Sequence, residues 1–217
     1  MTSKFLIILL CVALIVVSVR LYLVTNNSCQ ETQVPMSDTL SANDDFYDVI
    51  MSRASVRSYL DKSVEDEKID KLLHAAMAAP TAMDKRPWHF IVVTEKDILK
   101  KLADASPNAK MVATAPLAVV ICGDMSKEKD DWTKDFWIQD VSAASENMLL
   151  QAHSMGLGGV WTAIWPSVER GAAVSSLLET PEHIIPFATL VFGYPSSPSQ
   201  PKDKWDEFNV SYELYGE

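Results

Sequence analysis

Hydrophobic residues are distributed differently in the first 42 residues than in the rest of the chain. Phe5 to Val19 is an apolar run broken only by Ser18, and residues 21–24 are apolar again after Arg20. The first run suits the apolar region of a secretory signal, and the whole stretch is just long enough for a tilted membrane helix in which Arg20 snorkels. Residues 1–24 are therefore predicted to be an N-terminal signal or membrane anchor, and the polar residues 25–42 a linker.

The fate of this N-terminal segment stays open between three alternatives. It can be an uncleaved anchor, a signal that is cleaved although no small-x-small site follows clearly, or a lipidation signal for Cys29 that matches the usual pattern only at Ser28. Lys4 and Arg20 flank the apolar run almost symmetrically, so the positive-inside rule barely discriminates the topology. The sequence predicts a membrane-anchored or exported protein without fixing the side of the membrane.

From residue 43 onward, the pattern changes to segments with helical or strand periodicity. Helical spacing extends over 44–51, 65–78 and 139–155, and strand-like apolar runs over 88–94, 117–122, 160–164 and 188–192. The continuous run 117–122 is typical of a central strand, and the glycines of 156–159 supply a left-handed cap after the long helix. Because helices and strands interleave without a strict βαβ order, residues 43–217 are predicted to form one mixed α+β domain.

Composition and charge exclude several classes of function. The chain has 217 residues, 48% hydrophobic and 22% charged, which is enough for one domain with a substantial core. Its formal net charge of -10 argues against nucleic acid as a partner, because neutralising phosphates takes a basic surface. The absence of Cys-x-x-Cys and His-x-x-x-His spacings argues against a metal site, and Cys11 and Cys122 are expected to be inert packing residues.

Two segments could bind an anionic group. Arg53, Ser55 and Arg57 place two guanidiniums and a hydroxyl within five residues, which can bind a phosphate bidentately. Lys202 and Lys204, which follow the sequence Gly-Tyr-Pro at 193–195, could complete such a site. Taken alone, each of these groups could equally be solvated surface.

Two further segments could approach a planar ring. In 79–88 (APTAMDKRPW), Pro80 ends the preceding helix, the small residues leave backbone groups accessible, and Asp84 could accept a hydrogen bond from an isoalloxazine imide. A plain proline-bracketed loop is the alternative. The segment 156–163 (GLGGVWTA) is not a dinucleotide fingerprint, because the helix precedes the glycines, but its backbone amides could face a flavin. No acid, base or nucleophile arrangement stands out, so the chain either is not an enzyme or lets a cofactor supply the chemistry.

Together, in the same order and at comparable separations, these segments resemble the flavin-binding pattern of the nitroreductase family. The matching motifs are R-x-S-x-R from Arg53, A-P-T-A-M-D-K-R-P-W-H-F from Ala79, Q-D-x-x-A-A-x-x-N from Gln139, G-L-G-G-V-W from Gly156, and G-Y-P from Gly193 with a later K-x-K. Each motif is weak by itself, whereas their ordered conjunction over residues 46–205 is specific.

The resemblance implies an α+β fold with a mainly antiparallel sheet flanked by helices, in an intertwined homodimer that holds two FMN molecules at the subunit interface. The implied contacts are Arg53, Ser55, Arg57, Lys202 and Lys204 at the phosphate and ribityl end; Pro80, Thr81, Ala82 and Asp84 from the other subunit; and the backbone of Trp161, Thr162 and Ala163 at the redox edge. Gln139 and Asp140 match a motif with a structural role. The implied reaction is ping-pong, from NAD(P)H through the flavin to a nitroaromatic, a quinone or a similar small acceptor, with no side chain as catalytic acid or base.

Three residues depart from the family pattern. Asp84 stands where Asn is usual, Arg86 where Gln is usual, and Lys204 where Arg is usual, which keeps the charge but loses the planar fork. Asp84 is expected to disfavour the reduced anionic flavin and to lower its potential, unless Lys85 or Arg86 compensates.

Residues 124–137 lie where the family varies a substrate lid. Trp132, Phe136 or Trp137 could stack on an aromatic acceptor, with core packing expected for at least one of them. A deiodinase- or dehalogenase-like flavoenzyme is an alternative, but it calls for a lid with Glu, Tyr and Lys, and this segment has no tyrosine. The other alternative is a membrane-associated flavin-binding protein without NAD(P)H turnover. The aromatic tail after residue 195 could wrap a partner subunit or pack on its own chain.

Overall fold

The computed structural model describes residues 44–130 and 132–216. The predicted signal or anchor (1–24) and linker (25–42) lie outside the described residues. Within the described ranges, no helix combines the length and the apolar character that a membrane span requires.

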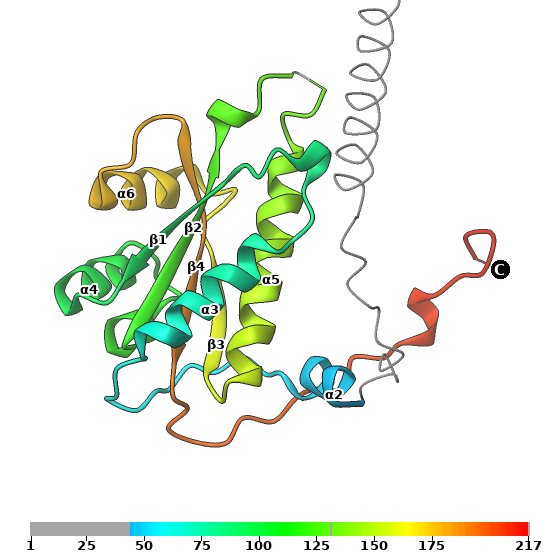
Figure 1. Ribbon diagram of the computed structural model, residues 1–217, viewed down its shortest axis with the longest axis horizontal. Coiled ribbons are helices and arrows are strands. Elements are labelled where there is room, and N and C mark those ends of the chain that lie inside the picture. Colours follow the sequence, from blue (N-terminus) through cyan, green and yellow to red (C-terminus); the bar gives the residue numbers. More distant parts are fainter. Residues whose placement is uncertain (1–43, 131, 217) are drawn as a thin grey trace, which may run out of the picture. The chain divides into compact units, whose positions relative to one another are not determined.

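A four-stranded antiparallel sheet forms the centre of the described domain (Figure 1). Its strands are β1 (Trp88–Val93), β2 (Leu117–Asp124), β3 (Gly158–Ala163) and β4 (Ile184–Gly193), in the spatial order β1-β2-β4-β3. All neighbouring pairs are antiparallel. The predicted α+β fold is confirmed, and the run 117–122 belongs to an inner strand.

Helices cover both faces of the sheet. Helices α3 (Asp66–Met77) and α5 (Phe136–Ser154) lie on one face, and α4 (Lys96–Asp104) and α6 (Val168–Leu178) on the other (Figure 1). Strand β2 is apolar at every position from 117 to 122 because alternate side chains enter the two cores. The α3–α5 core receives Leu117, Val119 and Ile121, and the α4–α6 core receives Ala118, Val120 and Cys122.

The remaining elements are short. Helix α2 (Asp44–Ser52) precedes the first candidate motif, and four 3-10 helices lie in the connections: η1 (Ala82–Asp84), η2 (Lys110–Thr114), η3 (Met125–Lys127) and η4 (Glu207–Asn209). Helices α4 and α6 are not among the elements predicted from the sequence. Signals for both were available: Ile98, Leu99 and Leu102 follow helical spacing, and Ser167 caps α6 by accepting a hydrogen bond from the backbone N–H of Arg170 at 3.4 Å.

Helix α5 ends in the left-handed glycine cap that the glycines after it predict. Gly156 has φ of 76°, its N–H donates to the His153 carbonyl at 3.0 Å, and the Leu157 N–H donates to the Ala152 carbonyl at 2.9 Å. This pair of hydrogen bonds is a Schellman cap, which reverses the chain and directs it into β3. The first candidate motif then packs against the beginning of that strand.

Candidate functional site

The segment Arg53–Arg57 lies along β3, which brings two of the candidate motifs together. Ser55 forms a parallel bridge with Gly159, and the Val56 N–H donates to the Gly159 carbonyl at 3.0 Å. The approach needs a glycine at 158, because a Cβ added there would lie 2.6 Å from the Cβ of Val56. Any side chain larger than hydrogen at position 158 would therefore force the segment 53–57 away from β3.

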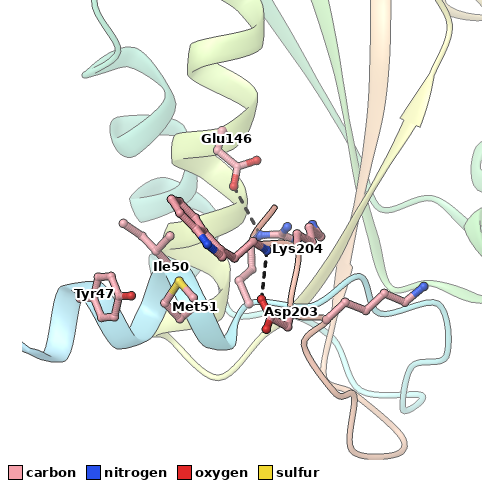
Figure 2. Close-up of a pocket in the computed structure, with 9 residues that line it drawn as sticks. Tyr47, Ile50, Met51, Glu146, Asp203 and Lys204 are labelled. Carbon is pink, nitrogen blue, oxygen red and sulfur yellow. Dashed lines mark hydrogen bonds and ion pairs between the residues drawn. The ribbon is translucent and has the colours of Figure 1, made fainter. Parts of the chain in front are cut away.

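A cavity of about 520 Å³ collects three of the predicted phosphate ligands (Figure 2). Its lining residues are Tyr47, Ile50, Met51, Arg53, Glu146, Lys202, Asp203, Lys204 and Trp205. About 150 positions separate Arg53 from Lys202 and Lys204 in the sequence, yet all three line this one cavity. The convergence of three cations on one cavity suits an anionic group.

Arg53 is held in this cavity by an ion pair. Its Nε lies 3.3 Å from Oε1 of Glu146, on α5, and only 19% of the Arg53 side chain is exposed. Figure 2 shows Glu146 on α5, with a dashed line from its carboxylate to a neighbouring side chain. At the end of α2, Ser52 Oγ and His153 Nε2 are 2.8 Å apart, and burial together with the charge of Arg53 lowers the pKa of His153. Both effects disfavour a second positive charge beside Arg53.

Arg57 lines a second cavity, of about 270 Å³. Its other lining residues are Ser106, Asn108, Met111, Val160, Trp161, Thr162, Ala163 and Arg170. Residues 161–163, which were predicted to lie at the redox edge of the flavin, therefore line one cavity together with Arg57. Arg53 lines the other cavity. Ser55 lines neither of the two cavities, and its backbone pairs with β3.

Arg170, which is not among the site residues predicted from the sequence, lies in the first turn of α6 and lines this second cavity. One guanidinium nitrogen, Nη1, donates to the Ala163 carbonyl at 3.3 Å and so fixes the end of β3. Trp161 and Thr162 are also held: the Trp161 ring packs edge-to-face on Phe187 at 5.6 Å, and Thr162 Oγ1 donates to the Thr189 carbonyl at 2.8 Å. The only sequence signal for Arg170 was its place two residues after the α6 start.

The loop 80–87 lies at the opposite end of α5 from His153. The Ala82 N–H donates to Asp140 Oδ1 at 3.1 Å, and Asp140 and Glu146 are separated by about 9 Å along the α5 axis, from the rise per residue. Pro80, Thr81, Ala82 and Asp84 line neither of the two cavities described above. Within one chain, the structure therefore does not bring this loop to the cations.

The two unusual residues of this loop bind each other. Arg86 donates to both Asp84 oxygens, from Nε at 2.7 Å and from Nη2 at 2.6 Å. This bidentate pair lowers the pKa of Asp84 and sets a positive charge against the negative one. Of the two cations expected near Asp84, Arg86 is therefore the one that pairs with it, whereas Lys85 contacts Glu128, Asp130 and Thr133.

The aromatic residues of 124–137 divide between core and surface. Trp137 is 3% exposed and packs edge-to-face on Trp165 and Phe187, at ring-centroid distances of 5.3 and 5.9 Å. Trp132 is 70% exposed, with its ring 5.9 Å from that of Phe136. The expectation that at least one of the three belongs to the core is confirmed for Trp137, which leaves Trp132 and Phe136 available to a ligand.

In the parts of the chain that the structure describes, no group of His, Cys, Asp or Glu residues is arranged to hold a metal ion. Asp140, which the sequence analysis assigned a structural role, is buried and receives the Ala82 N–H. Burial, and secondarily the charge of Glu128, raise the pKa of Asp140.

Comparison with known proteins identifies the family. The family model described as "Nitroreductase family" matches residues 50–109 and 106–194. A relative from Methanothermobacter thermautotrophicus, provisionally named NADH dehydrogenase/NAD(P)H nitroreductase, is 44% identical over 171 residues, 79% of this chain and 88% of its own. A crystal structure from Bacteroides thetaiotaomicron with the same provisional name is 45% identical, with a TM-score of 0.74 over 78% of this chain and 98% of the other. An FMN-dependent nitroreductase from Clostridium difficile is 30% identical, with a TM-score of 0.71 over 77% and 99%. The chain therefore belongs to the nitroreductase family.

Proposed function

We propose that this protein is an FMN-dependent oxidoreductase that takes hydride from NAD(P)H and reduces a nitroaromatic, a quinone or a similar small acceptor. The observation that supports this most directly is the pair of cavities joined by the segment 53–57, one cationic and one formed by the free edge of β3. The names of the similar proteins, an NAD(P)H nitroreductase and an FMN-dependent nitroreductase, agree with it.

The first cavity fits the phosphate of FMN. Arg53, Lys202 and Lys204 supply three cations against the carboxylates of Glu146 and Asp203, so the cavity keeps a net positive charge in a chain of net charge -10. Lysine contributes a point charge and arginine a planar fork, which together suit a terminal phosphate. Glu146 orients Arg53 and competes with the phosphate for it.

The second cavity fits part of the isoalloxazine ring. Strand β3 is at the edge of the sheet, and from Val160 to Ala163 its outer side pairs with no other described strand. The backbone N–H and C=O groups on that side are therefore available to the polar edge of a planar ligand. Arg57 and Arg170 line the same cavity and favour negative charge on such a ligand.

When bound, FMN would supply the hydride and electron transfer, in a ping-pong cycle in which NAD(P)H leaves before the acceptor enters. The residues of this chain bind the phosphate, orient the ring along β3 and narrow the space open to water. None of them is assigned a proton-transfer role.

The homodimer is also part of the proposal. Residues 196–216 are exposed throughout, and the tail leaves the sheet after β4 and passes beside α2 (Figure 1). Its aromatic side chains are among the most exposed large hydrophobic side chains of the described residues: Trp205 76%, Phe208 90%, Tyr212 77% and Tyr215 102%. A tail of this kind is stable when a second subunit covers it, and that subunit would also bring its loop 80–87 to the flavin. Residues 1–24 would anchor or export this dimer.

The deciding experiment uses the full-length protein, purified in detergent. Its visible spectrum is recorded as isolated and after addition of FMN, and then NADH or NADPH is added without oxygen. A flavin band that bleaches on addition of reduced nucleotide supports the proposed reaction. A bound flavin that does not bleach favours a flavin-binding protein without turnover, and no binding of FMN refutes the proposal. Release of iodide from iodotyrosine would instead favour the deiodinase-like alternative, against which the absence of a tyrosine in 124–137 argues.

A further inference from the structure

Lys85, in the motif A-P-T-A-M-D-K-R-P-W-H-F, forms a largely buried ionic cluster with residues that belong to none of the family motifs. Its Nζ lies 3.1 Å from Glu128 Oε2, 3.2 Å from Asp130 Oδ2 and 2.7 Å from Thr133 Oγ1. The exposed fraction is 14% for the Lys85 side chain, 1% for that of Glu128 and 0% for Thr133, whereas Asp130 is at the surface, with 57% of its side chain exposed. We refer to Lys85, Glu128, Asp130 and Thr133 as the Lys85 cluster.

The cluster joins two segments that are remote in sequence. Lys85 belongs to the loop 80–87, and its three partners belong to the segment 124–133, where the family varies its lid. Two more hydrogen bonds join the same segments: Lys127 Nζ donates to the Arg86 carbonyl at 3.0 Å, and the Asp124 N–H donates to the Pro87 carbonyl at 3.0 Å. Both acceptors are neutral backbone carbonyls, so the ion pairs between the two segments, among the described residues, are those of Lys85.

The loop needs such an attachment because its backbone conformation is unfavourable. Met83, Asp84 and Arg86 have φ values of 53°, 53° and 51°, in the left-handed region that side chains with a Cβ rarely adopt. Such residues persist where surrounding contacts determine the conformation, and they concentrate at functional sites. In this loop the surrounding contacts come from Asp140 at Ala82 and from the segment 124–133.

Negative charge exceeds positive charge inside the cluster. Lys85 faces two carboxylates, Glu128 and Asp130, and Glu128 Oε1 is buried without a hydrogen-bond partner among the described residues. The Lys85 ammonium is the one cation within 4 Å of Glu128 in the described part of the chain. Removing one partner of a buried ion pair leaves an uncompensated charge, which is far more unfavourable than removing both. The docking of 124–133 therefore depends on Lys85.

We propose that Lys85 is a positioning residue that fixes the segment 124–133 to the loop 80–87, so that the lid and the flavin-contacting residues order as one unit. The part of this inference that concerns flavin rests on the proposed function. The attachment itself belongs to the protein without cofactor and can be measured there.

The test compares Lys85→Met with Lys71→Met in the full-length protein. Lys71 is the matched control, because its ammonium makes one exposed ion pair with Glu67 at 2.8 Å on α3. Amide hydrogen exchange of the flavin-free proteins should be accelerated about tenfold or more over both 80–87 and 124–133 in Lys85→Met, and over neither in the control. The double variant Lys85→Met/Glu128→Gln, which removes both charges, should restore slow exchange in large part.

The cofactor arm measures the dissociation constant and the midpoint potential of FMN in the same proteins. Lys85→Met is expected to weaken FMN binding about tenfold and to shift the potential, with recovery in the double variant. If Lys85→Met does not fold, Thr133→Val replaces it, since that change removes the 2.7 Å contact without leaving a buried charge. Faster exchange in only one of the two segments, or equal effects of Lys85→Met and Lys71→Met, would overturn the inference. A wild-type protein that binds no FMN would refute the proposed function, while the exchange arm would still decide the role of Lys85.

Discussion

Replacing Gly158 by alanine tests whether the contact between β3 and the segment 53–57 builds the phosphate site. The added Cβ would lie 2.6 Å from the Cβ of Val56 and 2.7 Å from both of its methyl groups, and Val56 is only 6% exposed. Contacts under 3.0 Å do not persist, so the segment must move away from β3. Overpacking of this kind costs about 1–3 kcal/mol of folding free energy.

The movement is expected to reach the cofactor because Arg53 is three residues from Val56. If a third to a half of that cost appears in binding, the FMN dissociation constant rises about two- to tenfold, since 1.4 kcal/mol corresponds to a factor of ten. Urea unfolding measures the loss of stability, and fluorescence titration with FMN measures the affinity. The midpoint of thermal unfolding should fall by roughly 2–4 °C for each kcal/mol in a domain of this size.

Gly171→Ala is the matched control for this substitution. Gly171 lies inside α6, and a Cβ added there meets nothing within 4 Å. Alanine at this position is expected to stabilise the protein by about 0.5–1 kcal/mol, since glycine is unfavourable in a helix interior. The role of the contact between β3 and the segment 53–57 would be refuted if Gly158→Ala kept the wild-type stability and FMN affinity, or if both alanine variants behaved alike.

Three further outcomes follow from named contacts. Asp84→Asn should raise the FMN midpoint potential and Arg86→Gln should lower it, while the double variant returns near wild type; equal potentials in all four proteins would contradict a role for this bidentate pair. The hydrogen bond from Tyr194 to Glu65 Oε2, at 2.7 Å, is the main cause that lowers the pKa of Glu65 to about 2. A depressed carboxyl pKa contributes stability above its unfolded value near 4.5 and loses it as the pH falls toward 2, so Tyr194→Phe should move acid unfolding to higher pH, as followed by circular dichroism. Burial raises the pKa of Cys122 to about 12, so a thiol reagent should modify it only as fast as the domain unfolds, and labelling of the native protein at a rate independent of urea would show that the site is accessible.

The sequence by itself determined the class of fold and the family, because both depend on local patterns. Apolar periodicity specified the long helix before Gly156 and the inner strand 117–122, and the glycine cap between α5 and β3 is a property of a few adjacent residues. The ordered motifs were sufficient for the resemblance to the nitroreductase family, and the comparisons confirm it.

Only the tertiary structure decided which charged residues act together. Arg53 and Arg57 are four residues apart in an extended segment, so their Cα atoms are separated by up to about 13 Å, and they line different cavities. Lys202 and Lys204 join Arg53 because the chain after β4 passes beside α2, and Lys85 meets Glu128 because loop and lid share one end of the sheet. The charge and hydrogen-bonding capacity of a residue can be read from its type. Which residues it interacts with depends on distances that become short only when segments remote in sequence pack together.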